Sequence, residues 1–150
     1  VALAMREVVS GGLMHRDLSS HNVLVASLHP VSIKVADYGM DMVSEEFYGS
    51  GGNFPVRYTA PEVFTSRYWS EMSDVFSFGV LLWELYAGGA VPYGSERTEE
   101  QIAEFVVAEG RLEKPAGCPE TMFSIMGECW DHNPANRPSF GELACRFAAM

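Results

Sequence analysis

Residues 73–87 read SDVFSFGVLLWELYA, and this stretch decides the fold because it is apolar on nearly every side of a helix. A surface helix carries one apolar stripe, whereas a helix that is apolar all round is buried. We therefore expect a helix over residues 73–87 in the middle of the core, with the other elements packed on it.

Further helices are indicated on both sides of this segment. The capping-box pattern, Ser or Thr followed three residues later by Glu or Gln, predicts helix starts at residues 98–101 and 139–142. Pro119 fits the first turn of another helix, which runs to Trp130. Residues 1–9 have apolar positions near helical spacing, and Gly11 and Gly12 then end the helix. The fold is therefore predicted to be mainly helical.

Two β-branched segments lie between these helices. NVLVA (22–26) and VSIKVAD (31–37) are separated by four residues and predict a hairpin with a short turn. Residues 38–60 are rich in Gly, Ser and charge and show no period. More than 20 residues without regular structure are uncommon in a compact domain unless they are functional.

Length and composition limit the function classes. A chain of 150 residues with 47% hydrophobic residues fits one domain, or one lobe of a larger domain. The net charge of −10, with only 10 Lys and Arg, argues against a nucleic-acid partner. Cys118, Cys129 and Cys145 lack disulfide or zinc spacing, and we expect buried thiols in a reducing compartment. The first residue is Val and no signal peptide is present, which suggests a piece of a longer protein.

Polar residues gather around the predicted hairpin. Asp17 and Asn22 flank the start of its first strand, and Asp37 ends its second strand. A hairpin brings Asn22 and Asp37 to one edge, with Asp17 in the loop beside them. Carboxylate and amide oxygens suit Mg²⁺. Each residue alone could be an ordinary turn or cap, but H-R-D-x-x-x-x-N, then D-Y-G 15 residues later, then A-P-E form an ordered pattern.

The chain resembles the C-terminal lobe of a protein kinase. HRDLSSHN (15–22) resembles the catalytic loop, DYG (37–39) stands where the family has DFG, and APE (60–62) closes the activation segment. The resemblance implies an α+β, mainly helical lobe built as a helical bundle around a central buried helix, with a small β-hairpin at the cleft. Residues 1–150 would form a partial kinase domain, truncated at its N-terminus, without the N-terminal lobe.

The resemblance also implies cofactors and roles for the polar residues. ATP and Mg²⁺ would be the cofactors, and a protein would be the substrate. Asp17 would accept the proton of the substrate hydroxyl, while Asn22 and Asp37 would hold Mg²⁺ and contribute to the ATP site. Leu24 would pack against the adenine ring.

Five residues are assigned structural roles by the same resemblance. His15 would pack beneath the catalytic loop, and Asp74 would accept hydrogen bonds from the loop backbone. Arg137, in WDHNPANRPSF, would pair with Glu62. Tyr38 replaces the usual Phe, so its hydroxyl must reach water or a partner.

The residues that usually separate tyrosine from Ser/Thr kinases meet neither pattern, because Ser19 and His21 occupy those positions. FPVRYTAPE (54–62) resembles the substrate shelf of tyrosine kinases, which would comprise Pro55, Val56, Arg57 and Tyr58. We therefore expect a tyrosine kinase, with a tyrosine-kinase-like Ser/Thr kinase as the alternative.

Regulation is predicted at Tyr48, which the resemblance places where many tyrosine kinases are phosphorylated. A phosphate there would add about −1.5 to −2 charges and could pair with Arg16 beside the catalytic Asp.

No GxGxxG loop and no VAIK-like lysine precede these motifs. The chain alone is therefore expected to be inactive, as a fragment that needs the N-terminal lobe of its own domain. A kinase-derived, non-catalytic interaction module is the alternative. The kinase domain is expected on the cytoplasmic side, in either a soluble or a receptor parent.

Overall fold

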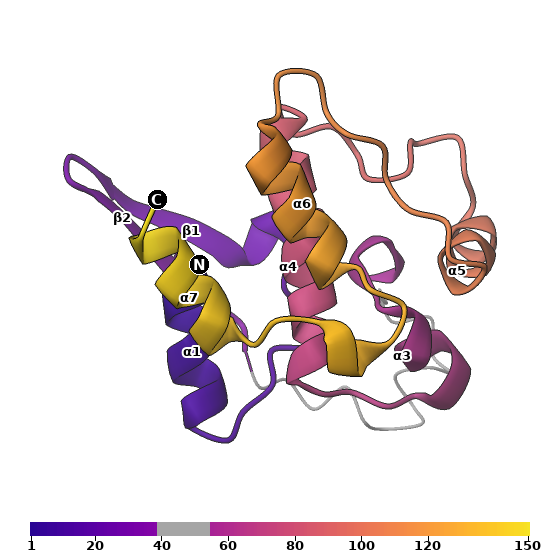
Figure 1. Ribbon diagram of the computed structural model, residues 1–150, viewed down its shortest axis with the longest axis horizontal. Coiled ribbons are helices and arrows are strands. Elements are labelled where there is room, and N and C mark those ends of the chain that lie inside the picture. Colours follow the sequence, from indigo (N-terminus) through magenta and orange to yellow (C-terminus); the bar gives the residue numbers. More distant parts are fainter. Residues whose placement is uncertain (39–54) are drawn as a thin grey trace.

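The computed structural model describes residues 1–38 and 55–150, so Tyr48 and the Gly of DYG lie outside the described residues. The longest described helix, α4 (Glu71–Tyr86), runs through the middle of the molecule (Figure 1). Ten consecutive residues, 73–82, are buried, which is possible only where every side of a helix is covered. This confirms the central buried helix. It begins two residues earlier than predicted because Ser70 caps it, accepting the Met72 N–H at 3.2 Å.

The other helices that the structure describes lie around α4. In Figure 1, α1 (Ala2–Ser10) and α7 (Phe140–Ala148) lie side by side, α6 (Glu120–Cys129) runs along α4, and α5 (Glu99–Val107) lies beside α3 (Pro61–Ser66). The predicted capping boxes at Thr98 and Ser139 are present. Pro119 occupies the N-cap position of α6, one residue before the first turn in which it was predicted, and makes no side-chain capping hydrogen bond. Helix α3 was not predicted.

Helices α4 and α6 approach closely because Gly79 has no side chain. A Cβ at this position would lie 2.5 Å from Trp130 Nε1 and 2.8 Å from the Cys129 Cβ. Both Trp130 and Cys129 are buried, so neither has open space to move into.

Three short 3₁₀ helices complete the helical elements of residues 1–38 and 55–150: η1 (Ser20–Asn22), η2 (Val56–Tyr58) and η3 (Pro134–Asn136). The first two lie in the segments for which the sequence predicted functional residues. Among the described residues, no helix is both long enough and apolar enough to span a bilayer.

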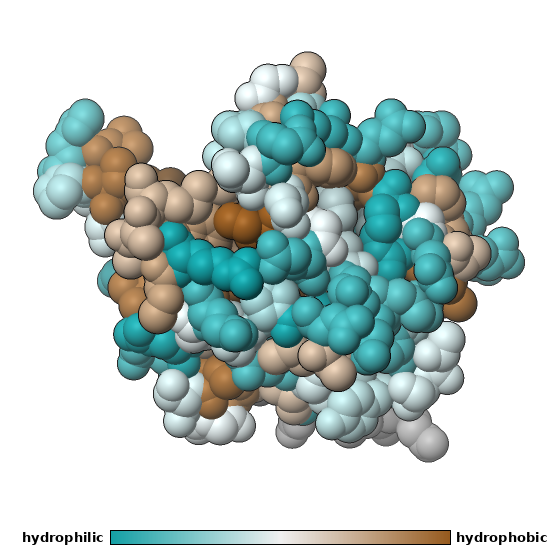
Figure 2. Space-filling model, in the orientation of Figure 1, coloured by the Kyte–Doolittle hydropathy of each residue, from teal (hydrophilic) through white to brown (hydrophobic). Residues whose placement is uncertain are grey.

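The predicted hairpin is confirmed as antiparallel strands β1 (Val23–Leu28) and β2 (Val31–Val35), with Val23 opposite Val35. It projects from the helices, and hydrophobic atoms are visible near its far end (Figures 1 and 2). Leu28 is 67% exposed and Val31 77% exposed at that end. The hairpin is thus attached to the helical part at its other end, where β1 begins and β2 finishes.

Two of the three cysteines fit the prediction. Cys118 and Cys129 are free and buried, and burial raises the pKa of the Cys129 thiol to about 12. The prediction for Cys145 was wrong, because this residue is exposed. Helix α7 buries Phe140, Leu143 and Ala144, and Cys145 is turned roughly 100° further round the helix.

Candidate active site

The polar loop, residues 15–22, is fastened to α4 by Asp74. The backbone N–H groups of His15 and Arg16 donate to the two Asp74 carboxylate oxygens at 2.7 and 2.8 Å. Burial raises the pKa of Asp74 to about 6, against the opposing effect of these two donors. Arg16 has a φ of 69°, a left-handed conformation that costs about 1–3 kcal/mol in a non-glycine residue. The Asp74 contacts therefore hold a strained turn in place.

His15 lies fully buried beneath the loop. Its Nδ1 accepts the backbone N–H of Asp17 at 3.3 Å, which requires an unprotonated Nδ1. Burial lowers the pKa of His15, so the neutral ring is favoured. The expected packing residue thus also supports the backbone of Asp17.

Asp17 and Asn22 are in direct contact. The Asn22 amide nitrogen donates to the Asp17 carbonyl at 2.7 Å and to Asp17 Oδ2 at 3.0 Å. Both contacts use the nitrogen, so the amide oxygen of Asn22 faces away from Asp17. Asn22 is 7% exposed, and this contact fixes the orientation of its side chain.

The hairpin brings Asp37 to the same end as Asn22. The Ala36 N–H donates to the Asn22 carbonyl at 2.9 Å, and Asp37 is the next residue. Asp37 has a φ of 57°, a conformation that Asp tolerates better than most residues, and its side chain is exposed. Leu24, on β1, is 51% exposed. Tyr38, which follows Asp37, is 50% exposed, so its hydroxyl can reach water.

These residues offer few metal ligands of their own. In residues 1–38 and 55–150, no three His, Cys, Asp or Glu side chains cluster as a metal site. An amide oxygen and an exposed carboxylate nevertheless fit Mg²⁺, which keeps waters and takes phosphate oxygens when it binds a nucleotide. Asn22 and Asp37 therefore fit Mg²⁺ bound together with a phosphate ligand, not a metal site built from protein alone.

A cavity of about 440 Å³ opens between the polar loop and the shelf, residues 55–58. It is lined by Asp17, Ser19, His21, Asn22, Pro55, Val56, Arg57, Tyr58 and Glu99. Arg57 holds the shelf in place, because its Nη1 donates to the carbonyls of Pro92 and Gly94 at 2.6 and 2.7 Å. The structure thus brings the predicted base and the predicted substrate shelf to one cavity.

Sequence reasoning missed Glu84, on α4. Its Oε1 accepts the Ser20 hydroxyl at 2.9 Å, and its Oε2 accepts the Tyr58 hydroxyl at 2.6 Å. Ser20 belongs to the polar loop and Tyr58 to the shelf. The signal for Glu84 was its charge, which interrupts the apolar segment 73–87.

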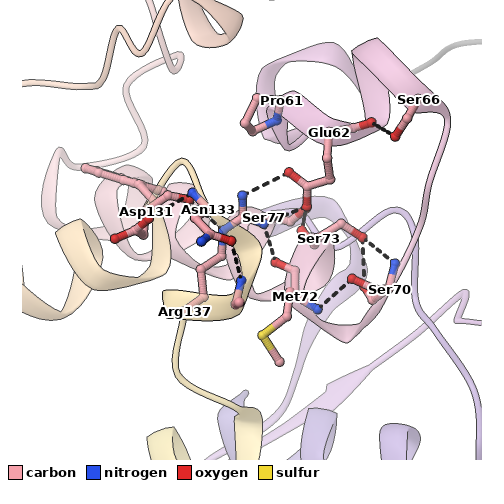
Figure 3. A network of polar contacts seen from close by, with 12 residues as sticks. Pro61, Glu62, Ser66, Ser70, Met72, Ser73, Ser77, Asp131, Asn133 and Arg137 are labelled. Carbon is pink, nitrogen blue, oxygen red and sulfur yellow. Dashed lines mark hydrogen bonds and ion pairs between the residues drawn. The ribbon is translucent and has the colours of Figure 1, made fainter.

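Glu62 and Arg137 form a bidentate ion pair (Figure 3). Arg137 Nη1 and Nη2 donate to the two Glu62 oxygens at 2.7 and 2.9 Å, and the guanidinium also donates to the carbonyls of Met72 and Asp131. The Arg137 side chain is 0% exposed and that of Glu62 14%. The pair connects α3, which follows the shelf, to the segment before α7.

Within the described residues, the motifs now have places in the structure: the polar loop on Asp74, the Asn22–Ala36 link, the shelf, and the Glu62–Arg137 ion pair. A sequence model described as protein tyrosine and serine/threonine kinase matches residues 1–147. The chain belongs to this kinase family. Of the predicted site residues, Tyr48 lies outside the described residues, and its pairing with Arg16 stays a prediction.

Known tyrosine kinases are similar to the chain over almost all of its length. It is 39% identical to the transforming protein Abl of Abelson murine leukemia virus, over 100% of the chain and 20% of that protein. It is 40% identical to mouse tyrosine-protein kinase Fer, over 95% of the chain and 17% of that protein. It is 34% identical to mouse inactive tyrosine-protein kinase 7, over 96% of the chain and 14% of that protein. The chain therefore spans at most a fifth of the length of these three relatives.

Proposed function

We propose that residues 1–150 are the C-terminal lobe of a two-lobed protein kinase domain that transfers the γ-phosphoryl group of ATP to a protein hydroxyl. The observation that carries this proposal is the cavity in which Asp17, its partner Asn22 and the shelf meet. Family membership gives the reaction class, and the cavity gives the place where a substrate hydroxyl would face a carboxylate.

In the proposed reaction, the substrate hydroxyl oxygen bonds to the γ-phosphorus of ATP. The bond between that phosphorus and the bridging oxygen of ADP breaks, and the hydroxyl proton passes to the Asp17 carboxylate. Asn22 and Asp37 would hold Mg²⁺, which neutralises phosphate charge when bound. The exposed face of Leu24 offers an apolar surface to the adenine ring.

The preferred acceptor is a tyrosine hydroxyl. The shelf, residues 55–58, resembles the tyrosine-kinase pattern, and the similar proteins Abl and Fer are named tyrosine-protein kinases. A tyrosine-kinase-like Ser/Thr kinase is the second candidate, because Ser19 and His21 line the cavity at the positions that usually separate the two groups.

We further propose that activity requires an N-terminal lobe in the same protein, on the cytoplasmic side. Such a lobe would supply the glycine-rich loop and the lysine that bind the ATP phosphates. A non-catalytic interaction module is the remaining candidate, favoured by the similarity to inactive tyrosine-protein kinase 7. The presence of Asp17, Asn22 and Asp37 together supports the enzyme instead.

The test is phosphoryl transfer by the full-length protein with ATP, Mg²⁺ and paired peptides that differ only in Tyr or Ser at the acceptor position. We expect phosphotyrosine, measured by mass spectrometry, and its loss in Asp37→Asn but not in Glu128→Gln, a surface carboxylate on α6. Phosphoserine alone would favour the Ser/Thr candidate. Absence of transfer to any acceptor would favour the interaction module.

A further inference from the structure

The cavity beside Asp17 also receives a carboxylate from a distant part of the chain. Glu99, the first residue of α5, lines it together with the polar loop and the shelf. Helix α5 contacts η2, which forms most of the shelf, and it also contacts α3, beside which it lies in Figure 1. The packing of α5 on the shelf therefore brings Glu99 to the cavity, although Glu99 lies far from Asp17 in the sequence.

Negative charge predominates among the described residues that line the cavity when His21 is neutral. Asp17 and Glu99 supply two carboxylates, and Arg57 supplies a guanidinium whose Nη1 already donates to two backbone carbonyls. The Glu99 side chain is exposed, and it forms no hydrogen bond or ion pair with any residue that the structure describes. Its carboxylate is therefore available to a cation on a bound peptide.

The neighbouring residue Glu100 distinguishes a role in the cavity from a role in the helix. Glu99 and Glu100 both lie in the first turn of α5, where the helix dipole stabilises negative charge. That stabilisation applies to both residues alike. Successive helix positions are turned by about 100°, and of the two residues Glu99 lines the cavity while Glu100 does not. Glu100 is therefore a matched control for any effect of Glu99 on a bound peptide.

The size of the cavity limits which peptide positions Glu99 can reach. An extended peptide advances about 3.3 Å per residue, so a cavity of about 440 Å³ spans only a few residues. With the acceptor hydroxyl at Asp17, a side chain at Glu99 belongs to a residue within about three positions of the acceptor. The formal charge of −10 on the whole chain also favours the approach of a cationic peptide.

We propose that Glu99 is a specificity-determining residue that selects protein substrates with Lys or Arg within about three positions of the acceptor residue. This inference rests on the proposed function, because it assigns the cavity to the substrate segment that carries the acceptor hydroxyl. Glu99 pairs with a basic side chain there and repels an acidic one. An exposed ion pair changes an equilibrium constant by about 1.4- to 5-fold. Attraction of Lys and repulsion of Glu together give a preference of about 2- to 25-fold.

The experiment measures kcat/KM of the full-length protein for otherwise neutral peptides with Lys or Glu at each of about three positions on either side of the acceptor. At about pH 8, where an ordinary histidine is neutral, wild type should prefer Lys over Glu at one position or more. The preference should disappear in Glu99→Gln, reverse in Glu99→Lys and persist in Glu100→Gln. It should also vanish near 1 M salt, where the screening length falls to about 3 Å. A Glu99→Gln variant that loses activity toward all peptides equally, with the Lys preference intact, would overturn the proposal.

Equilibrium binding of fluorescent peptides with Phe at the acceptor position gives a readout without turnover. If the wild type transfers no phosphate but binds the Lys peptide more tightly than the Glu peptide, and Glu99→Gln removes that difference, the proposed function fails and the selectivity of Glu99 stands. If the wild type is active and treats Lys and Glu peptides alike at every position, this inference alone fails. If the wild type neither binds nor phosphorylates any peptide, both fail.

Discussion

Removing one partner of the Glu62–Arg137 ion pair should destabilise the fold severely. In Glu62→Ala, the Arg137 guanidinium remains fully buried and loses both carboxylate contacts, at 2.7 and 2.9 Å. It keeps the carbonyls of Met72 and Asp131 and its position 5.2 Å from the centre of the Phe76 ring. These partners carry no negative charge, so the buried positive charge of Arg137 is left without its anion.

The cost of leaving such a charge without its partner is about 3–5 kcal/mol. For a unit of this size, each kcal/mol lowers the melting temperature by about 2–4 °C, so we expect a loss of about 6–20 °C. Arg137→Ala should fall in the same range, because it leaves Glu62 without its cation and removes the contacts with two carbonyls. Chemical and thermal denaturation of the full-length protein would measure both.

Two control variants separate the loss of this buried ion pair from the loss of an exposed one. Glu128→Ala breaks the exposed pair with Arg146, whose side chains are 41% and 44% exposed, and should cost at most about 1 kcal/mol. The double variant Glu62→Gln/Arg137→Met removes both charges and should recover part of the loss. Denaturation midpoints that match wild type in both single variants would refute the assignment of a buried pair.

Three other outcomes are expected. Gly79→Ala should destabilise by about 1–3 kcal/mol, because its Cβ would overlap Trp130; a wild-type melting curve would contradict this. Burial raises the pKa of Asp74 from 3.8 to about 6, so its stabilising contribution is present below pH 4 and lost as pH rises through 6. The free energy of unfolding of wild type should therefore fall relative to that of Asp74→Asn between pH 4 and 7. A difference between the two proteins that does not change with pH would contradict the raised pKa of Asp74. After incubation with ATP, phosphorylation of Tyr48 should raise activity only when Arg16 is present; Tyr48→Phe as active as the treated wild type would exclude that switch.

The sequence predicted those elements whose signals are local. The all-round apolar segment of α4, the capping boxes at Thr98 and Ser139, and the β-branched strands of the hairpin each depend on residues close together in the chain. The order of the kinase motifs added the approximate place of Asp17, Asn22 and the shelf.

The features that were missed depend on contacts between distant residues. Helix α3 has six residues, too few for a periodic pattern. The pairing of Glu62, in its first turn, with Arg137 was expected from the kinase resemblance and not from any local signal, because the two residues are 75 positions apart. Glu84 meets Ser20 and Tyr58 across 64 and 26 residues. The exposure of Cys145 follows from how α7 is turned against the core, which its apolar character does not determine.

The most direct test of the central claim concerns Asp17 in the full-length protein. Asp17→Asn retains the shape of the side chain but removes the proton acceptor, so ATP affinity should be unchanged while phosphoryl transfer falls by about 10²–10⁴-fold. ATP binding measured by calorimetry and peptide phosphorylation measured on the same sample would separate the two steps. Transfer by Asp17→Asn at the wild-type rate would contradict the assignment of this cavity as the site of phosphoryl transfer.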